Sequence, residues 1–171
     1  MGRLAELVAL ECGVRPAVAS QIRIAATLHD IGKQKIPRDI LNKPGKLNAQ
    51  EFDIIKTHTV LGAEMLSSMR GELGEMARAC CLYHHEYWNG GGYLGRFTDD
   101  LPFYIPFVAI SDVFTALVCE RSYKQAWPPS EAIAYIQNQA DTQFSPVLVG
   151  IFLSLVRIGS RVSAIYAEVR Y

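Results

Sequence analysis

The sequence has little that would direct it to a membrane or to nucleic acid. Its 171 residues include 17 Lys and Arg and 17 Asp and Glu, so the formal net charge is zero. Broad binding of a nucleic-acid polymer needs a basic surface, which this balance does not supply. The longest apolar run, Pro146 to Val156, is about half as long as a membrane span requires. We therefore expect a cytoplasmic protein without a membrane segment or a nucleic-acid polymer as partner.

Cysteines are also few, and none of them forms a CxxC pair. The four are Cys12, Cys80, Cys81 and Cys119. Cys80 and Cys81 are neighbours, and a disulfide between them would be strained. Because both flank apolar residues, we expect buried free thiols, which are typical of a reducing compartment.

No alternating strand pattern or internal repeat is present, and apolar residues recur at helical spacing almost throughout. The length suits one domain with a sizeable core. We therefore predict a compact all-α bundle of about six or seven helices, forming a single domain over residues 1–171. The expected helices cover about 4–12, 16–29, 48–66, 75–84 and 103–117, and two more begin near 130 and 145.

Local signals support these boundaries. Pro16 suits the first turn of a helix, and Asn48 with Glu51 resembles a capping box. Gly71 and Gly74 are expected to interrupt the helix that starts at Asn48. The longest non-helical stretch, residues 89–102, begins Asn-Gly-Gly-Gly-Tyr, and long loops in compact domains often carry function.

Only four histidines are present, and all of them fall into one series with two aspartates: His29, Asp30, His58, His84, His85 and Asp112. Any one of these histidines alone would more often be an ordinary core residue. Asp112, however, lies within an apolar helix, where an unpaired carboxylate would cost several kcal/mol and a metal cation would offset that cost. Four His and two Asp suit two neighbouring divalent ions, an arrangement known for phosphoester hydrolysis.

The series resembles the HD-GYP subgroup of the HD phosphohydrolase superfamily. The matching strings are HDIGKQKIPRDILNKPGKL (29–47), His58 with LGAEML, HHEYWNGGGY (84–93), SDVFTAL (111–117), RSYK (121–124) and FSP (144–146). They extend over most of the chain, from about Leu4 to Phe152. The resemblance implies an all-helical bacterial domain with a bi- or trinuclear metal centre that hydrolyses cyclic di-GMP, a second messenger.

The resemblance also implies a role for each matching residue. His29 and Asp112 would bind the first metal, Asp30 would bridge the two metals, and His58, His84 and His85 would bind the second. Lys33 would contact a phosphate, Tyr93 would pack against the nucleotide, and Arg121 and Lys124 would bind its phosphates. The catalytic residues would be Asp30 and Lys33.

The chemistry agrees with this assignment. Two divalent ions, iron or manganese with zinc as a further candidate, lower the pKa of a bridging water, so that hydroxide is available at neutral pH to attack phosphorus. Lys33 would stabilise charge on the phosphoryl oxygens. A cyclic dinucleotide has two phosphates, so a second cationic clamp is expected, and Arg121 with Lys124 suits it. The product would be linear pGpG, with GMP as a further product where hydrolysis continues.

The sequence departs from the family pattern at four places. The family has a further ligand His on the helix before His29, and by spacing it would precede Met1, so the domain would lack the N-terminal part of its first helix. Leu94 replaces the proline of GYP, which frees φ at that position. Thr115 stands where the family has Asp, and Pro106 where it has Arg.

These departures leave two alternatives open. One is a catalytically impaired domain that binds the nucleotide or a protein partner as a signalling module. The other is a hydrolase of another cyclic dinucleotide, such as a cyclic GMP-AMP. Further signalling domains or a second copy of the chain are the protein partners we expect.

Overall fold

A computed structural model of the chain describes residues 1–120 and 125–157. Within those ranges the chain forms nine α-helices, two short 3₁₀ helices and no β-strand, which confirms the predicted all-α class. The α-helices are α1 (Gly2–Glu11), α2 (Pro16–Ala26), α3 (Arg38–Leu41), α4 (Ala49–Lys56), α5 (His58–Met65), α6 (Gly71–Tyr83), α7 (Ile105–Val118), α8 (Pro129–Asn138) and α9 (Pro146–Arg157). The 3₁₀ helices are η1 (Ile31–Lys35) and η2 (Thr98–Asp100).

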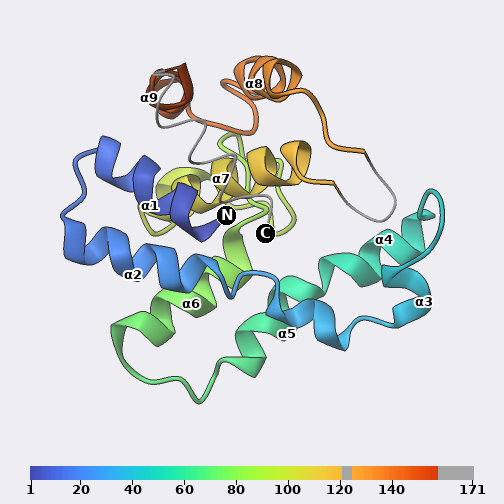
Figure 1. Cartoon of the computed structure of the whole chain (residues 1–171). Helices are drawn as coiled ribbons and strands as arrows, with labels where there is room; N and C mark the ends of the chain where they lie inside the picture. Colours follow the sequence, from blue (N-terminus) through green and yellow to red (C-terminus); the bar gives the residue numbers. More distant parts are fainter. Residues whose placement is uncertain (121–124, 158–171) are drawn as a thin grey trace.

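Helices α1 and α7 pack against each other near the centre of the molecule (Figure 1), and both contribute residues to the two hydrophobic cores. On α1, Leu4 and Val8 face one core together with α7, α8 and α9. Ala5 and Ala9, one position further along, face the second core together with α2 and α6. These alanines let α1 and α2 approach closely, because a helix pair separated by small side chains packs at short distance. Helices α1 and α7 are therefore held by packing in both cores, and together with α2, α6, α8 and α9 they form the frame of the molecule.

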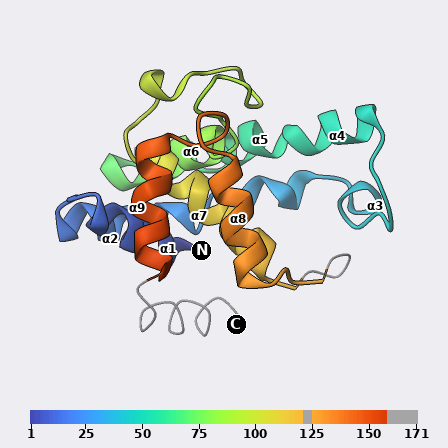
Figure 2. The ribbon, with the colours of Figure 1, turned by 90° about the horizontal axis from the view of Figure 1, so that it is seen from above.

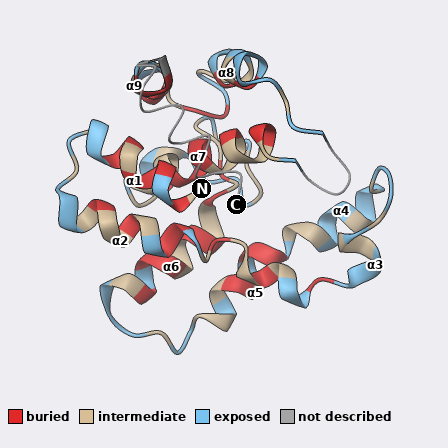
Figure 3. Ribbon diagram, viewed as in Figure 1, coloured by how far each residue is buried: buried red, intermediate tan, exposed pale blue. Residues whose placement is uncertain are grey.

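The segment containing α3 and α4 projects from this frame. Helices α4 and α5 follow each other nearly in line, and α3 lies beside the far end of α4 (Figures 1 and 2). Neither α3 nor α4 has a buried residue, and the surface there is mostly exposed or half-buried (Figure 3). We call residues 36–56 the arm. The capping box of Asn48 and Glu51 is present as predicted and begins α4.

Three predicted boundaries need correction. Helix α2 ends at Ala26, so His29 and Asp30 lie in the turn before η1. The helix expected over 48–66 is divided at Thr57, whose hydroxyl donates to the Ile54 carbonyl oxygen at 2.6 Å and tightens the turn there. Gly74 does not interrupt a helix but lies within α6, which begins at Gly71. The division at Thr57 and the presence of α3, which was expected to be loop, together explain why the described residues form nine α-helices and not six or seven.

Two further expectations can be compared with the structure. Cys80 and Cys81 are buried free thiols, as predicted. None of the described helices is long and apolar enough to cross a membrane.

Helix η1 packs directly on α5 through two glycines. A Cβ at Gly32 would overlap the backbone carbonyl oxygen of His58 and the backbone of Gly62, and a Cβ at Gly62 would come within 3.2 Å of the Gly32 nitrogen. Only glycine permits this approach, because any side chain would push the two backbones apart. The contact places the turn with His29 and Asp30 beside His58.

We predict that Gly32→Ala lowers the free energy of unfolding by about 1 to 3 kcal/mol, because the added methyl group meets rigid backbone. Urea denaturation followed by circular dichroism measures this change. Gly150→Ala is the matched control: a Cβ at Gly150, in α9, meets nothing within 4 Å. The control should be more stable than wild type by about 0.5 to 1 kcal/mol, because alanine favours a helix. Equal stability of the two variants would contradict the close-packing argument.

Candidate metal centre

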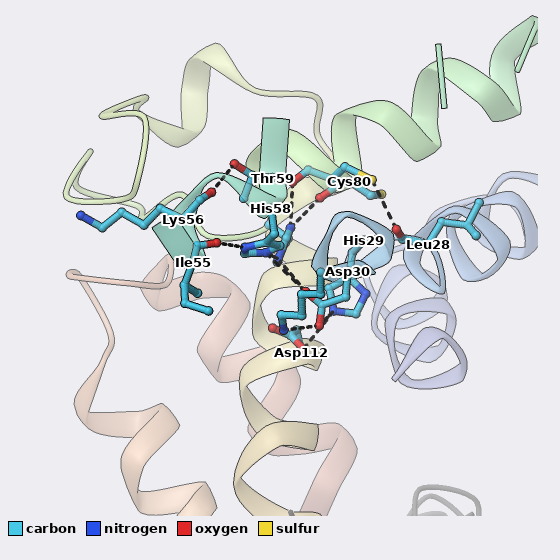
Figure 4. Close-up of polar contacts among 12 residues, drawn as sticks. Leu28, His29, Asp30, Ile55, Lys56, His58, Thr59, Cys80 and Asp112 are labelled. Atoms are coloured by element: carbon cyan, nitrogen blue, oxygen red, sulfur yellow. Dashed lines mark hydrogen bonds and ion pairs between the residues drawn. The ribbon is translucent and has the colours of Figure 1, made fainter. Parts of the chain in front are cut away.

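All six predicted ligands lie together between the helices. Figure 4 shows four of them, His29, Asp30, His58 and Asp112, pointing toward one another. His29 and Asp30 come from the turn between α2 and η1, His58 is the first residue of α5, His84 and His85 follow α6, and Asp112 lies in the middle of α7. The side chain of Asp112 is shielded within an apolar helix, as the sequence predicts. Four segments that are distant in the sequence thus supply one cluster.

Three of the imidazole rings are held by backbone carbonyls. The Nδ1 atom of His29 donates to the Ala26 oxygen at 2.8 Å, and that of His58 to the Ile55 oxygen at 2.6 Å. The Nδ1 atom of His84 donates to the oxygens of Cys80 and Cys81 at 2.8 and 3.0 Å. Because a carbonyl oxygen only accepts, each Nδ1 has the proton and each neutral ring keeps a bare lone pair on Nε2. Metal-binding histidines are commonly oriented in this way.

The bare nitrogens face one another. His58 Nε2 lies 3.3 Å from His84 Nε2, and neither has a proton to share when both rings are neutral. His29 Nε2 and Asp30 Oδ1 are buried, and neither makes a hydrogen bond of good geometry within the described residues, although carboxylate oxygens of Asp30 and Asp112 lie 3.3 Å from His29 Nε2. A cation between these atoms would remove the lone-pair repulsion and satisfy the orphaned groups. Two nitrogens that bind one zinc-like ion at about 2.1 Å lie about 3 to 3.5 Å apart, so the observed spacing fits an ion.

The ligand atoms form two overlapping groups. One consists of His58, His84 and His85 and the other of His29, Asp30 and His84, with ligand atoms in each group within 4.8 Å of one another. Asp112 Oδ1 adds to the second group, at 3.3 Å from His29 Nε2. Asp30 reaches both groups, because its Oδ2 lies 3.3 Å from His29 Nε2 and its Oδ1 lies 3.3 Å from His58 Nε2. Mixed nitrogen and oxygen donors of this kind suit two divalent transition-metal ions.

The charges divide the cluster in the same way. Burial lowers the pKa of His58 and His84 and lowers that of His85 to about 4, so these rings are neutral at pH 7. Burial also acts on His29, but the carboxylates of Asp112 and Asp30 outweigh it and raise the His29 pKa to about 9. In Asp112, burial opposes ionisation, yet His29 lowers the pKa to about 2. The metal-free site therefore has one imidazolium held between two carboxylates.

An open pocket of about 510 Å³ lies beside the cluster. Asp30, His58 and His85 line one part of it, and Lys33 and Tyr93 lie next to them. The opposite wall is the arm, which contributes Ile40, Leu41, Asn42, Lys43, Gly45, Leu47 and Ile55. Lys33 Nζ lies 2.5 Å from Asp30 Oδ2, so its ammonium stands at the boundary between cluster and pocket. A pocket of this size can hold a small-molecule ligand next to the cluster.

Glu86 is a site residue that sequence reasoning missed. Its buried carboxylate accepts the N–H of Leu94 at 2.7 Å and the N–H of Arg96 at 2.6 Å, which ties the glycine-rich loop to the end of α6. The sequence contained a signal for this role, because Glu86 lies between the adjacent histidines 84 and 85 and the glycines of the loop. A proline at position 94 would have no N–H to donate, so the departure at Leu94 provides an anchor. The freed φ at that position is thus compensated by a hydrogen bond.

Two further departures from the family pattern, Pro106 and Thr115, both lie in α7. Pro106 lies in the first turn of α7, where proline is well tolerated. The Thr115 hydroxyl is buried, and it has no hydrogen-bond partner in the described chain. Arg121 and Lys124, predicted to bind phosphates, lie outside the described residues and stay predictions. The arm's share of the pocket, including Lys43, was not foreseen.

Comparison with known proteins now identifies the family. The HD domain family matches residues 1–148. The chain belongs to the HD domain family. Its motifs place it in the HD-GYP group of that family, as the resemblance implied. HD-domain phosphohydrolases depend on metal ions, and the His and Asp cluster supplies donors for them.

Relatives of this HD domain are bacterial. The chain is 40% identical over 142 residues to 3'3'-cGAMP-specific phosphodiesterase 2 of Vibrio cholerae, covering 82% of the chain and 27% of that protein. It is 39% identical over 155 residues to a cyclic di-GMP phosphodiesterase of Thermotoga maritima, covering 90% and 41%. The chain therefore spans less than half the length of these curated relatives.

A solved structure shares the fold. An HDG"Y"P protein from Bdellovibrio bacteriovorus superposes with a TM-score of 0.70 at 16% identity, over 91% of this chain and 51% of that one. At that identity the likeness concerns the fold alone.

We predict that Asp112→Asn abolishes stoichiometric metal binding and leaves the helical fold intact, because an amide lacks the charge that balances a cation. Elemental analysis after dialysis measures the metal, and circular dichroism measures the fold. Asp100→Asn, an exposed carboxylate in η2, is the control and should keep its metal. An Asp112→Asn protein that unfolds but still binds metal would make Asp112 a structural residue.

We also predict that metal uptake at pH 7 releases about one proton from His29, because its pKa of about 9 keeps it protonated in the metal-free site and a ligand nitrogen must be bare. The apparent affinity should therefore rise with pH up to about 9. Calorimetry in two buffers of different ionisation enthalpy counts the protons. The His29→Ala variant should release about one proton fewer. Identical proton release by wild type and variant would show that His29 is not charged before metal binds.

Proposed function

We propose that this HD domain is a metal-dependent phosphodiesterase that hydrolyses cyclic dinucleotides, with cyclic di-GMP giving pGpG and then GMP. The observation that carries the proposal is the opening of the His and Asp cluster directly into a pocket that Lys33 lines. A reactive cluster and a binding cavity of suitable size therefore share one wall. The names of the relatives, which act on cyclic di-GMP or 3'3'-cGAMP, agree with this substrate class.

The cofactors we propose are two divalent ions, with iron or manganese as first choices and zinc as the next. His29 and Asp112 would hold one ion, His58, His84 and His85 the other, and Asp30 both. When bound, such a pair supplies Lewis acidity and lowers the pKa of coordinated water. The buried, preoriented Nε2 lone pairs support the proposal, because they give ligand positions that cost little reorganisation on binding.

The chain's own residues supply the remaining roles. Lys33 is placed to pair with a phosphoryl oxygen, since its side chain lines the pocket and its ammonium group donates a hydrogen bond to Asp30 at the edge of the cluster. Such a charge-assisted contact stabilises negative charge that develops on phosphate. Tyr93 lines the same pocket next to His85, where an aromatic ring can pack against a nucleotide. Arg121 and Lys124 remain our candidates for the second phosphate.

A second substrate has a specific observation in its favour. Among the relatives, proteins named for 3'3'-cGAMP stand beside those named for cyclic di-GMP, at 40% and 39% identity. The two nucleotides share the ring of two phosphates and differ in one base, so the metal cluster and Lys33 cannot distinguish them. Discrimination would fall to the pocket walls. We propose a bacterial cytoplasmic location for the enzyme, with other signalling domains or a second copy of the chain as candidate partners.

The deciding experiment incubates manganese- or iron-loaded protein with cyclic di-GMP and, separately, with 3'3'-cGAMP, and separates the products by chromatography. We expect linear dinucleotide from at least one of them. Metal-loaded protein that turns over neither nucleotide would refute the enzymatic proposal. Binding of a nucleotide without turnover would instead identify a non-catalytic module.

We predict that Lys33→Ala lowers kcat/KM about 10- to 100-fold, which corresponds to the loss of one charge-assisted hydrogen bond. The control is Lys46→Ala, an exposed lysine of the arm that does not line the pocket. Steady-state rates on the preferred nucleotide compare the two variants. The role assigned to Lys33 is wrong if both variants keep wild-type kcat/KM.

A further inference from the structure

His85 differs from the other three histidines in how its ring is held. Hydrogen bonds to backbone carbonyls orient the rings of His29, His58 and His84. In the described part of the chain, no hydrogen bond orients the ring of His85. Its position depends instead on ring contacts, with His84 at 4.0 Å between centroids and with Tyr93 at 4.4 Å.

The rings of Tyr93 and His85 pack in a tilted arrangement. The two ring planes are inclined by 34°, whereas the other ring contacts of His85 are steeper, at 44° with His84 and 79° with His58. Two rings packed at 4.4 Å between centroids restrain each other's orientation, because turning either ring loses contact area. The direction of the ring plane in turn sets where the nitrogen lone pair points.

Tyr93 is itself held in place from several sides. Gly92 passes so close to Glu86 and His85 that a Cβ there would overlap the Glu86 Cα atom, and Glu86 anchors the backbone just after Tyr93. The edge of Phe52 meets the Tyr93 ring at 6.0 Å between centroids. Lys56 Nζ lies 5.9 Å from the centre of the Tyr93 ring, within cation–π range. The glycine-rich loop thus brings a fixed aromatic ring against a metal ligand.

We infer that Tyr93 is a positioning residue for His85, holding this imidazole in the orientation that binds the second metal. The inference rests on the proposed metal centre and deepens it. The loop then has two tasks, because the ring that faces the nucleotide pocket also orders the ligand. Metal affinity at the group of His58, His84 and His85 becomes dependent on the loop.

The ring, and not the phenolic hydroxyl, performs this task. Burial raises the pKa of Tyr93 to about 12, so the phenol is neutral at all working pH values. Its hydroxyl makes no hydrogen bond to another described residue. Tyr93→Phe should therefore keep the metal affinity that Tyr93→Leu weakens.

The test titrates manganese into the metal-free 171-residue chain and follows free Mn²⁺ by electron paramagnetic resonance. Wild type should bind two ions, and Tyr93→Leu should bind one of them about ten-fold more weakly, a loss typical of removing support around a metal ligand. Tyr93→Phe should bind both within about two-fold of wild type. Phe103→Leu is the matched control: Phe103 is 59% exposed, and its ring contacts are with Tyr104 and Phe107, away from the cluster. It should also stay within about two-fold.

A double-mutant cycle separates positioning from a general effect on the fold. If Tyr93 acts through His85, Tyr93→Leu should cause no further loss of affinity in a His85→Ala background. Thermal unfolding confirms that each variant is folded. The inference is overturned if Tyr93→Leu binds like wild type, if Tyr93→Phe loses as much as Tyr93→Leu, or if the loss persists without His85.

The readout also separates this inference from the proposed function. A wild-type protein that binds two manganese ions but hydrolyses no cyclic dinucleotide refutes the enzyme and leaves the Tyr93 effect measurable. A wild-type protein that binds no manganese overturns the proposed centre and this inference together. Normal hydrolysis with unchanged manganese affinity in Tyr93→Leu refutes the inference alone.

Discussion

The close contact between η1 and α5 is the constraint on which the site depends. Gly32 lies against the backbone of His58 and Gly62 with no room for a side chain. This contact sets how far the turn with His29 and Asp30 stands from the first residue of α5. A displacement of about 1 Å would separate donor atoms that now lie within coordination reach, since metal–ligand distances tolerate about 0.2 Å. Backbone packing, rather than side-chain choice, therefore sets the geometry of the centre.

The metal-free cluster is costly in isolation, and the frame around it supplies the compensation. Burying carboxylates and bare imidazole nitrogens together opposes folding unless each charge has a counter-charge. His29 between Asp30 and Asp112 provides this in part, and Lys33 adds a cation beside Asp30. The two hydrophobic cores that meet at α1 and α7 hold the polar centre between them. Such a balance is common in sites where binding of an ion is linked to stability.

Much of the fold and of the site was predictable, for identifiable reasons. Helical spacing and the capping box at Asn48 are local signals, and both led to correct elements. The convergence of His29, Asp30, His58, His84, His85 and Asp112 was predictable because all four histidines of the chain fall into one series with two aspartates. The break at Thr57 was not, since it depends on one hydroxyl competing for a carbonyl. The Glu86 anchor and the pocket wall from the arm were not predictable either, because they join segments that are distant in the sequence and periodicity does not report such contacts.

The arm has a consequence for how this domain can diversify. It forms one wall of the pocket, yet α3 and α4 place no residue in either hydrophobic core. Its order rests on local bonds, such as the pair between Lys43 and Glu51 at 2.7 Å and the cap at Asn48. Substitutions on the exposed faces of α3 and α4 meet solvent instead of packed neighbours and so carry a small stability penalty. The arm's wall of the pocket can thus vary in evolution, while the clustered His and Asp side chains stay under the full constraint of the core.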